Sequence, residues 1–230
     1  MGYCSRSQAA LLILAKRVSV NGRIARDPET PARIGQDRIE IDGLPVEKRT
    51  AIYLVMNKPR GLVTTASDEK GRETIYDLLE PSTPWVGPVG RLDKASEGLL
   101  LLTNDSEWAA RITDPASHLD KVYHVQVDRV ADADLLAKIR EGCTFEGEHL
   151  RAKGARLLRS GDKNSWLEIT LDEGKNRQIR RLLEMLEVQV LRLVRTSIGP
   201  LELGELKKGA VRTLTAKEKQ AMDQAINRGV

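Results

Sequence analysis

Short apolar runs separated by turn residues recur along the chain, and most of them have the length of strands. Residues 99–102 are four consecutive leucines, preceded by Gly98 and followed by the polar segment 103–105. A continuous apolar run of this length with polar ends is typical of a strand buried on both faces. The pattern predicts a central strand there, and it predicts that the preceding loop, 87–97, is fixed to the core.

Further strands are predicted where apolar residues alternate or cluster between turn signals. Asn21-Gly22 is a hairpin signal, because a type I′ turn needs positive φ at both central positions. The predicted strands are 18–20, 23–24, 38–41, 51–58, 121–128, 165–174 and 188–201. Pro59 ends one of them, since proline donates no ladder hydrogen bond.

Helices are predicted where apolar residues recur at helical spacing behind a capping residue. Ser5 or Ser7 caps the first helix, and Thr215 with Glu218 forms a capping box for the last. The predicted helices are 5–17, 73–80, 106–113, 131–142, 175–187 and 215–227.

Strands outnumber helices, and no regular alternation of strand and helix with glycine-rich turns is present. This pattern favours an α+β fold with a mixed, largely antiparallel sheet. The polar stretch PVEKRT, 45–50, separates a small N-terminal domain, 1–46, from a larger domain, 47–230.

Composition narrows the function classes. The chain of 230 residues is 40% hydrophobic, and its longest apolar runs are too short to span a bilayer, so we expect no membrane partner and a cytoplasmic location. The two cysteines, Cys4 and Cys143, are far apart and lack histidines at metal spacing, so neither a disulfide nor a metal site is expected.

Charge is uneven along the chain. The net charge is +4, and the segment 175–181, KNRQIRR, carries four cations directly after the acidic stretch LEITLDEG. Such a segment is either a solvated helix face or a phosphate-binding surface. Aromatic residues make up only 3% of the chain, so RNA binding through rows of stacked bases is not expected.

Asp93 is the candidate for chemistry in the loop 87–97. It either caps a turn through its own side chain or acts as a carboxylate held ionised by Arg91 or by a cation of KNRQIRR. Glycines at 87, 90 and 98 would then let a bulky substrate approach the backbone. Glu97 and Asp105 are the candidates for a second carboxylate, by sequence distance only. The spacing GPVGRLD does not fit a nucleotide-hydrolase phosphate loop.

Tyr123 and His124 are consecutive in a predicted strand and therefore face opposite sides of its sheet. Tyr123 is the better functional candidate, because a phenol offers a base both a flat apolar face and a polar tip.

Several motifs in a fixed order resemble one family. GRLDKASEGLLLLTND, KVYHVQV and EGKNRQIRRLLE, with YLVMNKPRGLVTT before them and VLRLVRTSIGPLELGELKKGAVRTLT after them, resemble the bacterial ribosomal RNA pseudouridine synthases of the RsuA family, the branch with an N-terminal S4 domain. The resemblance implies isomerisation of uridine to pseudouridine in RNA without a cofactor. The motif details favour the large-subunit subgroup.

The resemblance also implies roles for single residues. Asp93 matches the catalytic carboxylate, which either attacks C1′ or abstracts the 2′ proton. Tyr123 matches the tyrosine that stacks on the uracil, and Arg180 matches the basic residue that pairs with the catalytic aspartate. Leu182 and Leu183 follow as expected pocket wall. Further expected RNA contacts are Arg91, Lys175, Arg177 and Arg181.

Residues 5–43 resemble an S4 RNA-binding domain whose first helix is missing. Its expected RNA contacts are Arg6, Lys16, Arg17, Arg23 and Arg26. The expected partner is ribosomal RNA or a ribosomal precursor particle, and the expected state is a monomer. The alternatives are a small-subunit synthase, a noncatalytic RNA-binding assembly factor that keeps the fold, and a hydrolase of a glycosidic bond.

Overall fold

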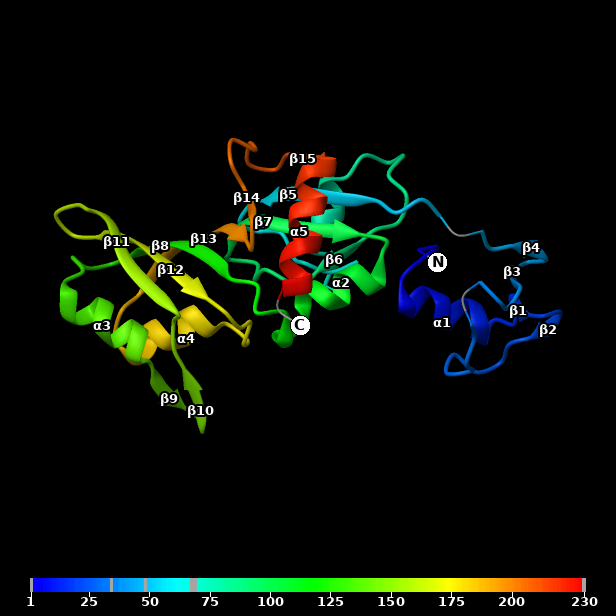
Figure 1. Cartoon of the computed structure of the whole chain (residues 1–230), viewed down its shortest axis with the longest axis horizontal. Coiled ribbons are helices and arrows are strands. Elements are labelled where there is room, and N and C mark those ends of the chain that lie inside the picture. The colour runs from blue at the N-terminus through cyan, green and yellow to red at the C-terminus, as the bar shows by residue number, and fades with distance from the viewer. Residues whose placement is uncertain (1, 34, 48, 67–69, 229–230) are drawn as a thin grey trace.

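The computed structural model of the chain describes residues 2–33, 35–47, 49–66 and 70–228. Its elements form a small N-terminal group and a larger body built on one long sheet (Figure 1). Both groups combine helices with strands, which confirms the α+β fold class.

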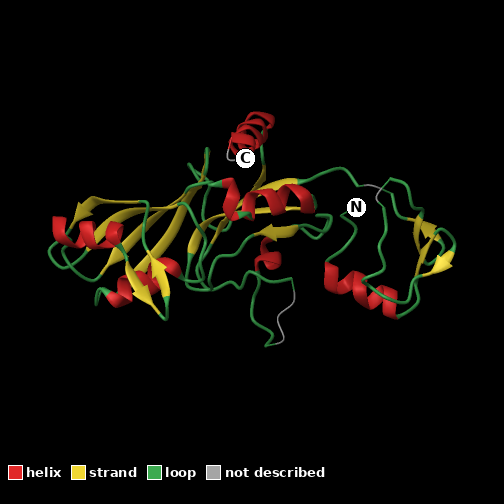
Figure 2. Ribbon diagram, turned by 60° about the horizontal axis from the view of Figure 1, so that its bottom comes forward, coloured by secondary structure: helices red, strands yellow, loops and turns green. Residues whose placement is uncertain are grey.

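The N-terminal group consists of a helix beside a small sheet (Figure 2). The capping box of Ser5 with Gln8 begins the helix, and Asn21 and Gly22 have φ of 52° and 77°, as the predicted hairpin turn requires. The elements are α1 (Arg6–Leu14), β1 (Val18–Val20), β2 (Arg23–Ile24), β3 (Ile39–Ile41) and β4 (Leu44–Pro45), with sheet order β2-β1-β3-β4. Residues 2–5, which precede α1, form no helix.

The boundary predicted between residues 46 and 47 falls in the connection between the two groups, and it stays a prediction. Lys48 of the linker 45–50 lies outside the described residues.

The larger body has a nine-stranded sheet. Its main order is β11-β12-β8-β13-β7-β5-β15, while β6 pairs with β7 and β14 pairs with β13. The strands are β5 (Tyr53–Lys58), β6 (Gly87–Val89), β7 (Glu97–Thr103), β8 (Lys121–Val127), β11 (Gly154–Ser160), β12 (Ser165–Leu171), β13 (Val190–Ile198), β14 (Leu201–Glu202) and β15 (Val211–Thr213). Among the pairings of these described strands, β13 with β7 is parallel and the rest are antiparallel. The sheet is therefore mixed and largely antiparallel, as predicted.

The leucine run forms β7, and every residue of this strand is buried. Leu99 and Leu101 contribute to one hydrophobic cluster, whereas Leu100 and Leu102 contribute to another on the opposite face. This alternation confirms a strand buried on both faces. One detail differs from the prediction, because residues 87–89 of the preceding loop form the strand β6.

Helices cover the sheet in two places. The helices of the body are α2 (Ser106–Thr113), α3 (Ala133–Glu141), α4 (Gln178–Met185) and α5 (Ala216–Arg228), with 3₁₀ turns η1 (Ile75–Leu78) and η2 (Pro115–Ser117). α3 and α4 pack at the β11-β12-β8 end, and α2 and α5 lie near the middle (Figure 1). The capping box of Thr215 with Glu218 begins α5, as predicted.

Several predictions of secondary structure differ from the fold, and the helix expected over 73–80 is only the 3₁₀ turn η1. The helix expected over 175–187 begins only at Gln178, so Lys175, Asn176 and Arg177 lie in the loop before it. The hairpin of β9 (Cys143–Phe145) and β10 (Glu148–Leu150) and the strand β11 were not predicted, and neither were the short strands β4 and β15. β9 and β10 have only three residues each, and the exposed positions of β11 follow no regular order, so none of them carries a pattern long enough to predict a strand.

Candidate active site

A buried lysine holds the loop that carries Asp93. Lys58 is fully buried, and its Nζ donates to the carbonyl oxygens of Pro59, Asp93 and Ser96 at 2.9 to 3.2 Å. Burial lowers the pKa of Lys58 to about 8, while the charges of Asp93 and Glu97 act in the opposite direction. Lys58 therefore binds both ends of the turn at 93–96 to the end of β5.

Asp93 lies beside two arginines of the basic segment. Its Oδ2 is 3.8 Å from Nη1 of Arg177 and 3.9 Å from Nε of Arg180. Arg180 is the more buried of the two, with a side chain 15% exposed against 52% for Arg177, and it also donates to the carbonyl oxygen of Ala95 at 3.2 Å. Burial, and then the charge of Arg177, lower the pKa of Arg180. Arg180 therefore lies beside Asp93 as expected, within ion-pair distance but without a hydrogen bond between Nε and the carboxylate among the described residues.

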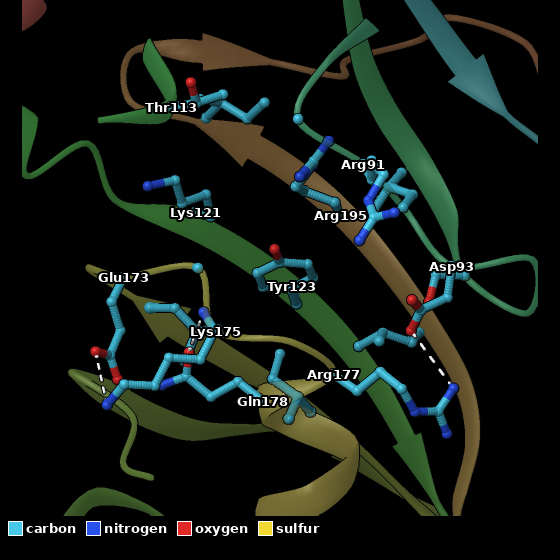
Figure 3. A pocket seen from close by; sticks show the side chains of 18 of the residues that line it. Arg91, Asp93, Thr113, Lys121, Tyr123, Glu173, Lys175, Arg177, Gln178 and Arg195 are labelled. Atoms are coloured by element: carbon cyan, nitrogen blue, oxygen red, sulfur yellow. Dashed lines mark hydrogen bonds and ion pairs between the residues drawn. The ribbon is translucent and has the colours of Figure 1, made fainter. Parts of the chain in front are cut away.

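Asp93 and Tyr123 line the same cavity, which has a volume of about 460 Å³. Tyr123 comes from β8, Asp93 from the loop after β6, and the third wall from the start of α4 (Figure 3). Uracil with its ribose fits into a cavity of this size. His124 faces the other side of the sheet, where its Nε2 lies 3.5 Å from Glu168, as the alternation of the strand predicted.

Some of the other predicted RNA contacts of the larger body line the cavity, and one does not. Arg91, Lys175 and Arg177 line the cavity. Arg181 does not, because its guanidinium donates to Glu148 at 2.9 Å and lies over the ring of Phe145, which fastens α4 to the β9-β10 hairpin.

The prediction that Leu182 and Leu183 form the pocket wall is wrong. Both are fully buried in the core between α4 and the sheet, and neither lines the cavity. Ile179, one helical turn earlier, lines it instead.

In the N-terminal group, the predicted contacts Arg6, Lys16, Arg17, Arg23 and Arg26 are all exposed. Arg17 is engaged, since its Nε donates to Asp42 at 2.9 Å and thereby connects the end of α1 to the turn after β3. Arg23, on the edge strand β2, is the clearer candidate for a phosphate contact.

Neither candidate for a second carboxylate reaches Asp93. Asp105 caps α2 by accepting from the amide of Trp108, and it also accepts from the hydroxyl of Tyr53. Glu97 is buried and pairs with Arg192 and Lys208, at 2.9 Å and 2.6 Å. These bonds, with that of Arg192 first, lower the pKa of Glu97 to about 2 despite its burial. The cavity therefore holds Asp93 without a second carboxylate from these two positions.

The Glu97 ion pairs predict a defined pH dependence of stability. The folded pKa is lowered from 4.5 to about 2, so the ionised carboxylate contributes about 3 kcal/mol above pH 4.5, and this contribution is lost as the pH falls towards 2. Glu97→Gln is expected to lower the unfolding free energy by that amount at pH 7, with the difference from wild type shrinking below pH 4.5. Urea unfolding across this pH range measures it.

Asp134→Asn is the matched control, because Asp134 forms an exposed pair with Lys138 on α3. Its effect on the unfolding free energy should stay below about 0.5 kcal/mol at every pH. A Glu97→Gln difference that did not change with pH would contradict the assignment of this stability to the ion pairs.

Sequence reasoning missed several polar residues of the site, among them Lys58, Lys121, Gln178 and Arg195. Lys58 lies in the sequence MNKP. Its position directly before the proline that ends the predicted strand was the signal that could have identified it. Gln178 is buried and donates to Glu173 and to the carbonyl oxygen of Arg151. Arg195 is far from the site loop in sequence, and the pairings of β13 with β7 and with β8 bring it to the site. Within the described residues, no three metal-ligating side chains gather at one place.

Comparisons with known proteins identify the family of this chain. A family model described as RNA pseudouridylate synthase matches residues 52–185, and an S4 domain model matches residues 1–39. A ribosomal large subunit pseudouridine synthase B from Bacillus subtilis is 36% identical over 94% of this chain and 89% of its own length. An uncharacterised RNA pseudouridine synthase from Aquifex aeolicus is 38% identical over 98% of this chain and 91% of its own length.

A solved structure entitled crystal structure of pseudouridylate synthase has a TM-score of 0.69 and 31% identity, and covers 95% of this chain and 94% of its own. These likenesses define the class as RNA-modifying isomerases with an N-terminal S4 domain. The chain belongs to the RNA pseudouridylate synthase family.

Proposed function

We propose that the protein isomerises uridine to pseudouridine in large-subunit ribosomal RNA, with Asp93 as the catalytic carboxylate. One observation carries the assignment: Asp93 and Tyr123 line one cavity, with Arg177 and Arg180 beside the carboxylate. The Bacillus subtilis relative, which is named a large-subunit synthase and covers nearly the whole chain, supports the choice of RNA.

The geometry supports the following roles within this reaction. The target nucleotide leaves its stack, at a cost of a few kcal/mol, and inserts its base against Tyr123. Asp93 then meets the ribose, where it either attacks C1′ or removes the 2′ proton. In both routes the N-glycosidic bond breaks, the uracil turns, and a bond forms between C5 and C1′. No electrons are exchanged with another molecule, so the residues of the cavity suffice without a redox group.

Tritium release from C5-labelled uridine tests the proposal. Release from a large-subunit RNA transcript, with much slower release from a small-subunit transcript, is the expected result. Faster release from small-subunit RNA would overturn the large-subunit assignment. Absence of release from both RNAs and from ribosomal precursor particles would favour a noncatalytic assembly factor, and free uracil among the products would favour a glycosidic hydrolase.

RNA binding by the S4 domain predicts a change in salt dependence. Arg23→Gln removes an exposed cation on β2, and the slope of log affinity against log salt should become less steep by about one unit for each phosphate that the protein no longer neutralises. Filter binding at several salt concentrations measures the slope. Arg129→Gln is the matched control, because Arg129 is an exposed cation in the segment between β8 and α3, and α3 lies at the opposite end of the molecule from β2 (Figure 1). An unchanged slope for Arg23→Gln would place the RNA elsewhere.

A further inference from the structure

A buried arginine faces the cavity with part of its guanidinium unpaired. Arg195 is 6% exposed, and its Nε donates to the carbonyl oxygen of Leu99 at 2.8 Å. Its Nη2 has no hydrogen-bond partner among the described residues, although Arg195 lines the cavity. Leaving a buried N–H of a charged group unpaired is costly, so such a group at a cavity wall indicates a missing acceptor.

The fold holds Arg195 in this place. Arg195 on β13 is in register with Tyr123 on β8, and a bulge follows between Arg195 and Ser197. Because of this bulge, Arg195 and Ile198 both line the cavity although they are three positions apart. On the other side, a Cβ at Gly98 would collide with the carbonyl oxygen of Arg195, so glycine permits the close approach of β7. Gly98 thus admits this backbone contact and not the substrate, contrary to the expectation from sequence.

A second cation lies on the same strand face as Tyr123. Lys121 precedes it by two positions and also lines the cavity (Figure 3). Burial lowers the pKa of Lys121, and the charge of Arg195 lowers it further. The charges of Asp120 and Asp172 raise the pKa of Lys121, but both carboxylates form ion pairs with other cations. Asp120 pairs with Lys153, and Asp172 pairs with Arg151.

The cations of the cavity differ in depth. Arg91 and Arg177 are exposed, whereas Arg195 is almost completely buried. A flipped nucleotide enters a pocket with its base first, so its phosphates stay near the exposed cations. The group that reaches Arg195 is therefore the base, and the polar atoms that uracil offers to an N–H are its carbonyl oxygens.

We infer that Arg195, assisted by Lys121, forms a subsite for the carbonyl oxygens of the uracil ring and stabilises the ring after it has left the ribose. The inference rests on the proposed function. When the C1′–N1 bond breaks, its electron pair stays with the uracil, whose negative charge is shared by N1, O2 and O4. The ring returns this charge when C5 bonds to C1′, after which C5 loses its proton and N1 gains one. Preorganised N–H donors at such an oxygen stabilise the charge that develops there.

Single-turnover kinetics of Arg195→Gln tests this subsite. On large-subunit RNA, the rate constant should fall about 100-fold, as for loss of one oxyanion donor, while the RNA dissociation constant stays nearly unchanged. The same RNA made with 5-fluorouridine provides the second readout, by loss of the N1-linked nucleoside after digestion. Because fluorine stabilises the departing anion, the variant should lose clearly less on this RNA than on normal RNA.

Two further variants complete the test. Arg159→Gln is the matched control, because Arg159 is exposed and lies over Trp166 on β12, and its rate constant should equal that of wild type. Lys121→Gln should lower the rate constant on normal RNA by a smaller factor than Arg195→Gln, and again by less on the fluorinated RNA. If Arg195→Gln does not fold, the rate constants of Lys121→Gln on the two RNAs test the inference.

Three outcomes would overturn the inference. An equal loss on both RNAs would mean a structural role, and weaker RNA binding with an unchanged rate constant would mean a phosphate contact. A wild-type protein that converts neither RNA would overturn the proposed function, and the inference with it.

Discussion

Asp93→Asn is expected to lower the rate of uridine isomerisation by roughly 10⁴-fold or more, as for loss of a central catalytic group. Asparagine has nearly the same shape but can neither attack C1′ nor accept the 2′ proton as a carboxylate does. The loop should survive the change, because Lys58 and Ser96 hold it through the backbone carbonyl of Asp93. Among the described residues, the side chain itself makes two ion pairs near 4 Å.

Tritium release under single-turnover conditions measures this effect, with RNA affinity and thermal unfolding measured on the same preparations. Both of these should remain close to wild type, and Asp134→Asn on the surface of α3 should retain full activity. Residual turnover within tenfold of wild type would contradict a chemical role for Asp93. Loss of RNA binding together with activity would instead indicate that the carboxylate shapes the binding surface.

Local pattern was sufficient for most of the fold. The leucine strand, the Asn21-Gly22 hairpin and the helix 106–113 each depend on contiguous residues, and each is present. The β9-β10 hairpin and β11 depend on packing against α3 and α4, so their sequence lacks a strong pattern of its own. The basic segment shows the same limit, because Arg177 has a φ of 48° at the N-cap and delays the helix by three residues.

The site was predictable only where a motif marks it. Asp93, Tyr123 and Arg180 belong to local motifs, and the fold brings all three to one cavity or its edge. Lys58 and Arg195 act through contacts with residues 35 to 96 positions away, which no spacing rule contains. Leu182 and Leu183 show the opposite error. They were predicted at the site because they follow Arg180 in the sequence, but the helix directs their side chains to another face, into the core.

Arg180→Ala is expected to lower the isomerisation rate by roughly 100- to 1,000-fold, because it removes a partly buried cation beside the reacting carboxylate. Nε of Arg180 is buried without a hydrogen-bond partner among the described residues and lies 3.9 Å from Asp93. This donor is therefore free to tighten onto the carboxylate when substrate closes the cavity. Arg180 also binds the carbonyl oxygen of Ala95, so its loss loosens the loop itself.

Arg177→Ala is the matched comparison, because Arg177 lies at nearly the same distance from Asp93 but its side chain is 52% exposed. Water screens an exposed pair to about 1 kcal/mol or less, so this variant should lose less than about tenfold. Single-turnover rates at two salt concentrations separate the two arginines: added salt should reduce the effect of Arg177 and leave that of Arg180 largely unchanged. Equal losses in both variants would mean that total positive charge, and not the buried position of Arg180, sustains the reactivity of Asp93.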